Sequence, residues 1–467
     1  MIEKAAAITT KLQPHQQRAL NRALKNNLIL AHSTGSGKTL TSIAIADALG
    51  LPTTVLTPAS LVENYKKEIA KHKKGGPKID VMSLPTAVSR NYKIPKGNTL
   101  IIDEAHALRN QGTARQKYIQ DQLDNAGRVF ALTGTPAYND IADWSPLVNL
   151  VAKENVVPAD KAAFTDKYIG YRKVYPPLLA RLFHGAKPGV VPYLKNPSGL
   201  RKDILPYVDI FDTDIEKPER IDETIRVPMS KEQEDLYKYV AGKLPMSLLY
   251  KLRNNMPPSK QEARSLNSFL SGVRQVSNTP EAFVEGSEPG IKIQRAVDNL
   301  VKQLEKNDKL RALVYSNYLE SGVDSYARLL DAKGIKYNKF TGSMTPKQKK
   351  QVVDAYNSGE VPIILGSGSA SEGLDLKGTR LIQLLEPHFN DAKLDQVIGR
   401  GIRYKSHEGL PVKDRNVRVE RYLSQLPEQR NWLGIKNKDT AVDDYLTTRA
   451  GEKTQLINEI KQTLLGK

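Results

Sequence analysis

The chain is poor in residues that stabilise proteins through covalent links or large aromatic contacts. Its 467 residues include no cysteine, 2 tryptophans and 8 phenylalanines. The absence of cysteine excludes disulfide bonds and any zinc site built on thiolates. No apolar run approaches the ~18 residues of a membrane span, so we expect no membrane association. Carboxylates are also scarce, with 51 Asp and Glu against 70 Lys and Arg, which gives a formal net charge of +19. This excess predicts a polyanionic partner, most simply a nucleic acid.

A glycine-rich segment near the N-terminus has the pattern of a phosphate-binding loop. Its sequence is His32-Ser33-Thr34-Gly35-Ser36-Gly37-Lys38-Thr39, and it follows the apolar residues 28–30. Glycines let the backbone N–H groups turn toward phosphates, Lys38 supplies a charge for the β- and γ-phosphates, and Thr39 offers a hydroxyl to Mg²⁺. A helical pattern over residues 40–49 places a helix N-terminus at the same point. We therefore predict that the loop binds ATP with Mg²⁺.

Two carboxylates follow a buried-strand pattern at residues 99–102. They begin the run Asp103-Glu104-Ala105-His106. Side chains at the carboxyl end of a parallel strand face the crevice in which ligands bind. Asp103 is therefore expected to hold Mg²⁺, directly or through water, and Glu104 to polarise the attacking water as a general base. His106 is expected to link the site to neighbouring motifs.

The order of strand and helix patterns predicts an α/β fold with two lobes. Short apolar runs alternate with helical patterns up to residue 150 and again after residue 291, as in parallel sheets with crossover helices. The expected strands are residues 28–30, 55–56, 100–102, 129–132, 312–315, 363–365, 381–384 and 417–419. The expected parts are an ATP-binding lobe at 1–150, a mostly helical and irregular insertion with a linker at 151–290, a second lobe at 291–450 and a C-terminal amphipathic helix at 451–467.

The second lobe contributes a pair of arginines. One run after its strand at 363–365 is Ser369-Ala370-Ser371-Glu372-Gly373-Leu374-Asp375-Leu376, and the next is Gln396-Val397-Ile398-Gly399-Arg400-Gly401-Ile402-Arg403. Arginines three apart on a helix share a face, and a guanidinium aimed at a γ-phosphate stabilises the charge that develops in phosphoryl transfer. Alone, Arg-x-x-Arg is more often a solvated or nucleic-acid-facing stripe. After a phosphate loop and Asp-Glu-Ala-His, it predicts catalytic roles for Arg400 and Arg403.

The order of these motifs resembles that of superfamily 2 helicases and translocases, and most closely the SNF2 family. The resemblance implies two RecA-like lobes that bind ATP between them. Leu12-Gln13-Pro14-His15-Gln16 resembles the block in which a glutamine contacts adenine, which implies that Gln16 does so. It also implies that Gly373 and Asp375 line the nucleotide and help to couple closure of the lobes to the strand. The residues that it assigns to nucleic-acid contact are Thr57, Pro58 and Ser60 in motif Ia, Thr133 and Thr135 in motif III, and Ser369 and Ser371 in the second lobe.

Two further blocks resemble SNF2 proteins in particular. They are residues 223–237 and the segment Val273-Arg274-Gln275-Val276-Ser277-Asn278-Thr279-Pro280. Two positions depart from the general patterns. His32 stands where a phosphate loop usually has Gly or Ala, and Arg403 is followed by Tyr404-Lys405 where SNF2 proteins have Gly-Gln. With Leu410-Pro411, these departures are closer to the SNF2-like ATPases of bacteriophages and large DNA viruses.

The resemblance implies an ATP-dependent DNA translocase, stimulated by double-stranded DNA, that acts in DNA replication, recombination, transcription or repair, most simply in a virus. A helicase that separates strands of DNA or RNA is an alternative, so single-stranded DNA and RNA stay alternative partners. It would need a wedge, for which the Tyr- and Pro-rich residues 165–210 are the candidate, although a structural brace is the plainer interpretation. A third hypothesis is an ATP-gated clamp or adaptor that binds nucleic acid without travelling.

Two other surfaces are left open by the sequence. Tyr168, Tyr171, Tyr175 and Tyr193 are interleaved with Lys and Arg, a pattern that fits either base stacking or a small core. Leu456, Ile457, Ile460 and Leu464 share one face of a C-terminal helix, which either docks on a lobe or binds a protein partner. We expect an intracellular monomer, located in the cytoplasm of a bacterial host if it belongs to a phage, and otherwise in the nucleus or cytoplasm.

Overall fold

The computed structural model of the chain describes residues 7–33, 35–134, 141–211, 217–371, 374–389, 391–403, 405–427, 429–430, 436–437 and 439–466. They form two compact units. Unit 1 comprises Met1–Gly170, Leu194–Ile215 and Leu456–Lys467, and unit 2 comprises Tyr171–Tyr193 and Glu216–Gln455. Each unit has its own six-stranded sheet and its own apolar core. The predicted α/β fold with two parallel-sheet lobes is thereby confirmed.

The sheet of unit 1 is parallel throughout, with the order β3-β2-β4-β5-β1-β8. Its strands are β1 (Leu28–His32), β2 (Thr53–Thr57), β3 (Ile79–Ser83), β4 (Thr99–Ile102), β5 (Arg128–Thr133) and β8 (Val208–Phe211). Every residue of β1, β2 and β4 is buried, because helices cover both faces of a parallel sheet. The carboxyl ends of these strands therefore lie along one edge of the sheet, where the loops that follow them meet.

The helices of unit 1 begin and end largely at local signals. They are α1 (Pro14–Ala23), α2 (Lys38–Leu49), α3 (Val62–His72), α4 (Leu84–Ser89), α5 (Ala114–Gln122), α6 (Trp144–Ala152), α7 (Lys161–Tyr168) and α9 (Pro197–Ile204). Short 3₁₀ turns occur at Ala59–Leu61, Ala105–Leu108, Ile141–Asp143 and Leu205–Tyr207. Gly50 adopts a left-handed conformation after α2, at the point where the expected helical pattern over residues 40–49 ends.

Unit 2 repeats the parallel architecture with the order β11-β12-β10-β13-β14-β9. Its strands are β9 (Glu219–Pro228), β10 (Ala312–Tyr315), β11 (Asn338–Phe340), β12 (Ile363–Gly366), β13 (Leu381–Leu384) and β14 (Asn416–Gln425). Its helices are α10 (Lys231–Ala241), α11 (Met246–Arg253), α12 (Lys260–Asn278), α13 (Ile291–Lys306), α14 (Ser325–Ala332), α15 (Pro346–Ser358) and α16 (Asp391–Gly401). Minor elements are a π-helical segment at Leu319–Asp324, 3₁₀ turns at Gly368–Ser371 and Val412–Asp414, and a two-stranded sheet of β15 (Gln429–Arg430) and β16 (Lys436–Asn437).

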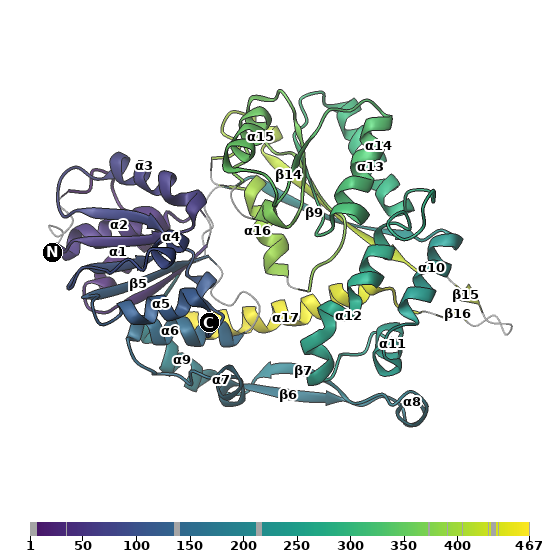
Figure 1. Cartoon of the computed structure of the whole chain (residues 1–467), viewed down its shortest axis with the longest axis horizontal. Helices are drawn as coiled ribbons and strands as arrows, with labels where there is room; N and C mark the ends of the chain where they lie inside the picture. Colours follow the sequence, from purple (N-terminus) through teal and green to yellow (C-terminus); the bar gives the residue numbers. More distant parts are fainter. Residues whose placement is uncertain are drawn as a thin grey trace. The chain divides into compact units, whose positions relative to one another are not determined.

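Residues 151–290 are less separate from the two sheets than the expected insertion. This region supplies β8 to the edge of the first sheet and β9 to the edge of the second. It also contains a two-stranded ribbon of β6 (Ile169–Val174) and β7 (Gly189–Leu194), with the short helix α8 (Leu178–Phe183) between them. Figure 1 shows α8 at the far end of this ribbon.

The C-terminal helix α17 (Val442–Leu465) begins well before the predicted amphipathic stretch. Its start is fixed by a buried ion pair in unit 2, in which the Lys292 ammonium lies 2.7 Å from the Asp443 carboxylate. Its end belongs to unit 1, where Ile460 and Leu464 are buried and the Arg201 guanidinium donates to the Thr463 carbonyl at 2.9 Å. The predicted apolar face is therefore used inside the chain. No described helix is long and apolar enough to cross a membrane.

Candidate nucleotide and nucleic-acid site

The phosphate loop lies between β1 and α2, as the sequence predicted. Gly35 and Gly37 have φ angles of 86° and 77°, in the left-handed region that glycine adopts without strain. The Lys38 ammonium donates to the carbonyls of His32 at 2.9 Å and Ser33 at 3.3 Å, so the lysine is held across the loop by its own backbone. The Ser36 hydroxyl is buried and has no hydrogen-bond partner among the described residues. Thr34 lies outside the described residues.

Two adjacent side chains of helix α1 contact the backbone of this loop. The Gln16 amide donates to the Gly37 carbonyl at 3.3 Å, and the His15 ring contacts the Ser36 carbonyl at 2.9 Å. A Cβ on Gly37 would lie only 2.5 Å from the Gln16 amide nitrogen, so Gly37 also permits this close approach. Gln16 accepts a hydrogen bond from the Gln13 backbone as well, which completes a capping box. Gln16 is thereby fixed beside the loop.

The two carboxylates follow β4 and have different surroundings. Asp103 accepts hydrogen bonds from the Thr57 hydroxyl and the Glu104 amide, both at 3.0 Å. Burial, and then the neighbouring charge of Glu104, raise the pKa of Asp103 to about 6. Glu104 has a left-handed φ of 49°, and its carboxylate lies 3.2 Å from the His106 ring nitrogen. The predicted acid pair therefore consists of two half-buried carboxylates, Asp103 with two hydrogen-bond donors and Glu104 with a histidine at its side.

These residues fit a magnesium ion by their chemistry. The Asp103 carboxylate and the Thr39 hydroxyl are hard oxygen ligands, and Thr39 is half-buried in the first turn of α2. No group of three or more His, Asp or Glu side chains that could hold a metal occurs in the described parts of the chain. A site with few protein ligands suits Mg²⁺, which keeps waters and binds through substrate phosphates.

An ionic cluster behind the loop was missed by the sequence analysis. Asp209 on β8 has a buried side chain that receives the His32 ring at 2.8 Å, and it pairs with Arg18 at 2.8 Å and Arg22 at 3.1 Å. Burial alone would raise the pKa of Asp209, but hydrogen bonds from His32 and Arg18 outweigh it and lower the pKa to about 2. Burial lowers the pKa of His32, so the neutral ring donates to the carboxylate. In the sequence, Asp209 is a single charged residue within an apolar run, and this position was the one sign of its role.

The same cluster joins α1 to β8 through stacked rings. His15 stacks on Phe211 with ring centroids 3.7 Å apart and planes 5° apart. His32 meets Phe211 edge-on at 5.8 Å, and its Nδ1 atom is buried without a partner among the described residues. The unusual histidine of the loop is thus held by β8, which comes from the region expected to be an insertion.

The arginine pair in unit 2 differs from its predicted geometry in one respect. Arg400 lies in the last turn of α16, but the helix ends at Gly401 and Arg403 lies beyond it, so the two do not share a helical face. A Cβ on Gly401 would be 3.0 Å from the Thr379 side chain, so the helix end packs tightly there. Arg403 instead pairs with Asp375 at 3.0 Å and donates to the Gly399 carbonyl at 3.3 Å. The structure therefore brings the predicted residues Arg403 and Asp375 together. Gly373 lies outside the described residues.

The residues predicted to touch nucleic acid have varied surroundings. Thr57 and Thr133 are buried at the ends of β2 and β5, and the Thr57 hydroxyl is engaged by Asp103. Pro58 is half-buried and Ser60 is exposed just after β2. In unit 2, Ser369 is half-buried and Ser371 ends a 3₁₀ turn. Thr135 lies outside the described residues.

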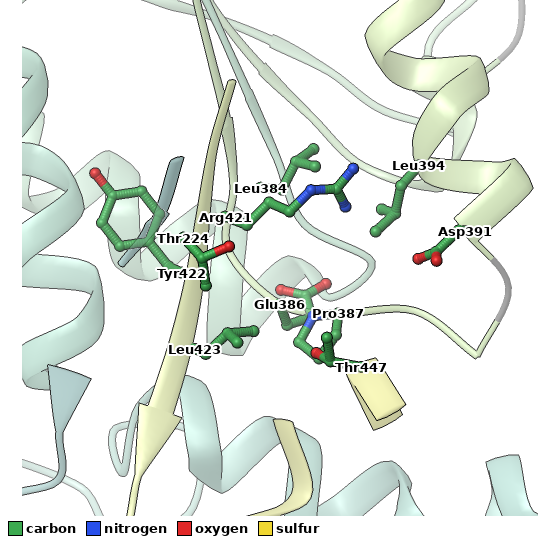
Figure 2. A pocket seen from close by; sticks show the side chains of 10 residues that line it. All are labelled: Thr224, Leu384, Glu386, Pro387, Asp391, Leu394, Arg421, Tyr422, Leu423 and Thr447. Atoms are coloured by element: carbon green, nitrogen blue, oxygen red, sulfur yellow. The ribbon is translucent and has the colours of Figure 1, made fainter. Parts of the chain in front are cut away.

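The SNF2-like block at the end of α12 has a packing role in unit 2. The Arg274 guanidinium lies 5.2 Å from the ring centroids of both Tyr318 and Phe389. Asn278 donates to the buried Glu386 carboxylate at 2.9 Å. A cavity of about 40 Å³ lies nearby, lined by Thr224, Leu384, Glu386, Pro387, Asp391, Leu394, Arg421, Tyr422, Leu423 and Thr447. Figure 2 shows these side chains, which come from β9, β13 and the residues just after it, β14, α16 and α17. The cavity has room for water molecules and is far smaller than a nucleotide pocket.

The chain matches three known domain families in sequence. Residues 9–75 match the type III restriction enzyme res subunit, residues 79–282 the SNF2-related domain, and residues 293–405 the helicase conserved C-terminal domain. A protein of Acanthamoeba polyphaga mimivirus, provisionally named an ATP-dependent RNA helicase, is 30% identical over 97% of this chain and 96% of its own. A termination factor NPH-I homolog of African swine fever virus is 24% identical over 94% of this chain and 75% of its own. The helicase domain of Pyrococcus furiosus Hef is 14% identical, covers 88% of this chain and 95% of its own, and superposes with a TM-score of 0.49.

Proposed function

Because the chain belongs to the SNF2-like ATPases of helicase superfamily 2, we propose that it couples ATP hydrolysis to movement along double-stranded DNA. Its relatives in large DNA viruses are named a helicase and a termination factor homolog. We place its work in DNA replication, recombination, transcription or repair. Strand separation on DNA or RNA is the second candidate, since the mimivirus relative is named for RNA.

The observation that carries the proposal is the hydrogen bond between Thr57 and Asp103. Thr57 ends β2 and begins the loop proposed to hold the nucleic-acid strand, whereas Asp103 is the proposed metal ligand. A change at the γ-phosphate that shifts Asp103 would therefore shift the loop of Pro58 and Ser60 through one direct contact. Such a contact supports a motor that links the state of ATP to its grip on a strand.

Each site residue has a defined task in the proposed cycle. Lys38 leaves its loop carbonyls to bind the β- and γ-phosphates, and Gln16 contacts adenine. The Thr39 hydroxyl and the Asp103 carboxylate would hold Mg²⁺, which neutralises charge on the phosphates. Glu104 takes a proton from the attacking water as the water oxygen bonds to the γ-phosphorus. The bond from this phosphorus to the β,γ-bridging oxygen breaks, and ADP and phosphate are the products. The contact of Glu104 with the His106 ring orients the carboxylate for the proton transfer.

The second unit is proposed to complete the site only during turnover. Arg400 and Arg403 would stabilise the charge that develops on the transferring phosphoryl group. The ion pair of Arg403 with Asp375 holds one of these arginines until phosphate competes for it. Hydrolysis would then depend on a conformational change and would be stimulated by whatever polymer favours that change.

The net charge of +19 supports a nucleic acid as that polymer. Contacts to the phosphate backbone carry no sequence information, which suits a motor that travels over any sequence. Binding should therefore weaken steeply as salt is raised. An ATP-gated clamp would show the same salt dependence, but with slow turnover and no displacement along the polymer.

The experiment that tests the proposal is the ATPase rate with no polymer, single-stranded DNA, double-stranded DNA or RNA, at one low salt concentration. Strong stimulation by duplex DNA, followed by displacement of a triplex-forming strand, supports the translocase. Stimulation mainly by single strands or RNA supports the helicase. The Glu104→Gln variant is the matched control, because it should bind ATP and polymer without turnover.

A further inference from the structure

The segment between β6 and β7, which contains α8, exposes a cluster of apolar side chains to solvent. Tyr175, Leu178, Leu179, Leu182 and Phe183 are 59%, 65%, 66%, 69% and 72% exposed. Leu178 and Leu182 are four residues apart on α8, as are Leu179 and Phe183, so the four side chains form one stripe. Large apolar side chains that gather on an exposed surface mark an interaction site.

The charged residues of the chain segment that contains this stripe are all positive. From residue 167 to residue 202 the chain has eight Lys and Arg and no Asp or Glu. Arg172, Lys173, Arg181 and Lys187 lie in the ribbon or its tip, and all four are exposed. A run of this composition complements a polyanion, and it would repel most basic protein surfaces.

The ribbon is held firmly against α11 and α12 of unit 2. The Val190 amide donates to the Pro258 carbonyl at 3.0 Å, and a Cβ on Gly189 would collide with the Pro257 carbonyl at 2.1 Å. The Lys260 ammonium lies 3.9 Å from the centre of the Tyr171 ring. At the tip, His184 stacks on Tyr250 with centroids 5.2 Å apart. The apolar stripe is therefore mounted on a supported element.

The two sides of α8 differ in the size of their side chains. Ala180 is the buried residue of this helix, and Leu178, Leu179, Leu182 and Phe183 face water. Ala186, three residues after the helix, is also buried. Burial would reverse this order if α8 were only a structural brace, because Leu and Phe gain far more free energy from burial than Ala. Tyr168 is buried, but Tyr175 and Tyr193 remain exposed. A structural brace therefore accounts for the buried Tyr168 at the start of this region, but it does not explain the exposed side chains of α8.

We propose that α8 is a wedge whose apolar side chains enter between the bases of a nucleic-acid duplex where its strands part. Phe and Leu side chains are suited to unstacking base steps, and the flanking cations would hold the phosphates on either side. This inference rests on the proposed ATP-driven motor and takes up its strand-separating candidate, because a motor must drive the tip against the duplex. It adds base-pair opening to translocation and names the part of the chain that performs it.

The test compares the full chain with the double variant Leu182→Ala, Phe183→Ala. The matched control is Val412→Ala, which changes an apolar residue of the same unit that is 80% exposed and lies outside the ribbon. One measurement is ATP turnover on fully paired duplex DNA. The other is the ATP-dependent rise in fluorescence of 2-aminopurine placed at the junction of a forked duplex, which reports unstacking. The wedge variant should keep turnover within about twofold and lose the fluorescence rise by about tenfold or more, as expected from base-stacking contacts.

ATP turnover tests the motor, and the fluorescence rise tests the wedge. A wedge variant with the wild-type fluorescence rise would overturn the wedge, as would a wild-type chain that turns over ATP on duplex without any rise. A wild-type dimer that the double variant converts to a monomer in sedimentation would assign α8 to a second copy and overturn the wedge too. Absence of stimulated turnover in the wild type would overturn the motor itself, and the wedge with it.

Discussion

Replacing Thr57 with valine should move the acid limb of the ATPase pH profile without unfolding the chain. Valine keeps the β-branched shape that fits a fully buried position at the end of β2. It removes the hydroxyl that donates to the Asp103 carboxylate at 3.0 Å. Among the described residues, the Glu104 amide would then be the remaining hydrogen-bond donor to this carboxylate. The substitution therefore tests one contact between the strand loop and the proposed metal ligand.

The size of the effect follows from the charge of the acceptor. A hydrogen bond to a charged group contributes about 1.5–3 kcal/mol, and one pKa unit corresponds to about 1.4 kcal/mol. Thr57 stabilises the ionised form of Asp103, whose pKa burial has already raised to about 6. Magnesium binding needs the ionised form, so activity falls as the pH drops through this pKa. Loss of the donor raises the pKa further, and we expect the limb to move by about one pH unit towards alkaline values.

The assay is kcat/KM for magnesium-bound ATP between pH 5 and 9 at saturating polymer. Thr53→Val is the matched control, since Thr53 is a buried threonine of the same strand whose hydroxyl donates to the Leu51 carbonyl at 3.2 Å. Its profile should coincide with that of the wild type. A Thr57→Val profile that also coincides with the wild type would refute the reasoning, because Asp103 would then not control the acid limb.

Four other substitutions have distinct expected results. Lys38→Ala should abolish hydrolysis, measured as phosphate release, because no other described loop side chain supplies a charge to the phosphates. Glu104→Gln should bind ATP in a filter assay but lose about 10²–10⁴ in turnover, and normal turnover would exclude it as the base. Arg400→Ala should retain ATP binding and lose polymer-stimulated turnover by about 10³ or more, and wild-type stimulation would exclude its role. Asp209→Asn should cost about 2 kcal/mol of unfolding free energy at pH 7 in urea titrations. Because the folded pKa of Asp209 is lowered, this difference should shrink as pH falls from about 4 towards 2.

The sequence predicted best those strands that are short apolar runs and those helices that have clear capping residues. The expected strands at 312–315 and 381–384 coincide with β10 and β13. Helix α15 begins with a capping box at Thr345 and ends at the left-handed Gly359, and both residue types are local signals. These features need no knowledge of the rest of the chain, because a cap satisfies backbone groups within one turn.

The pairing of β8 with β1 could not be predicted from such local signals. Asp209 bonds to His32 across 177 residues, and nothing in the sequence near either residue indicates the other. The polar strand β9 is similar, since most of its residues are exposed and its ladder to β14 sets its position. The helix expected to hold both arginines was wrong for Arg403, because α16 ends at Gly401 and the Arg403 amide donates to the Ser406 hydroxyl at 3.2 Å. For β8 and β9, pairing with a strand distant in sequence decided the local structure.

The strand β8 shows why the middle of this chain belongs with its nucleotide site. A phosphate loop usually has a small residue at the position of His32, where a ring needs both space and a partner. Asp209 gives that ring a charged acceptor, and Phe211 packs against both His32 and His15. The same carboxylate holds Arg18 on α1, next to the helical turn that carries Gln16. The two elements that would contact opposite ends of ATP are thereby fixed to one buried carboxylate, so a shift of β8 would move both together.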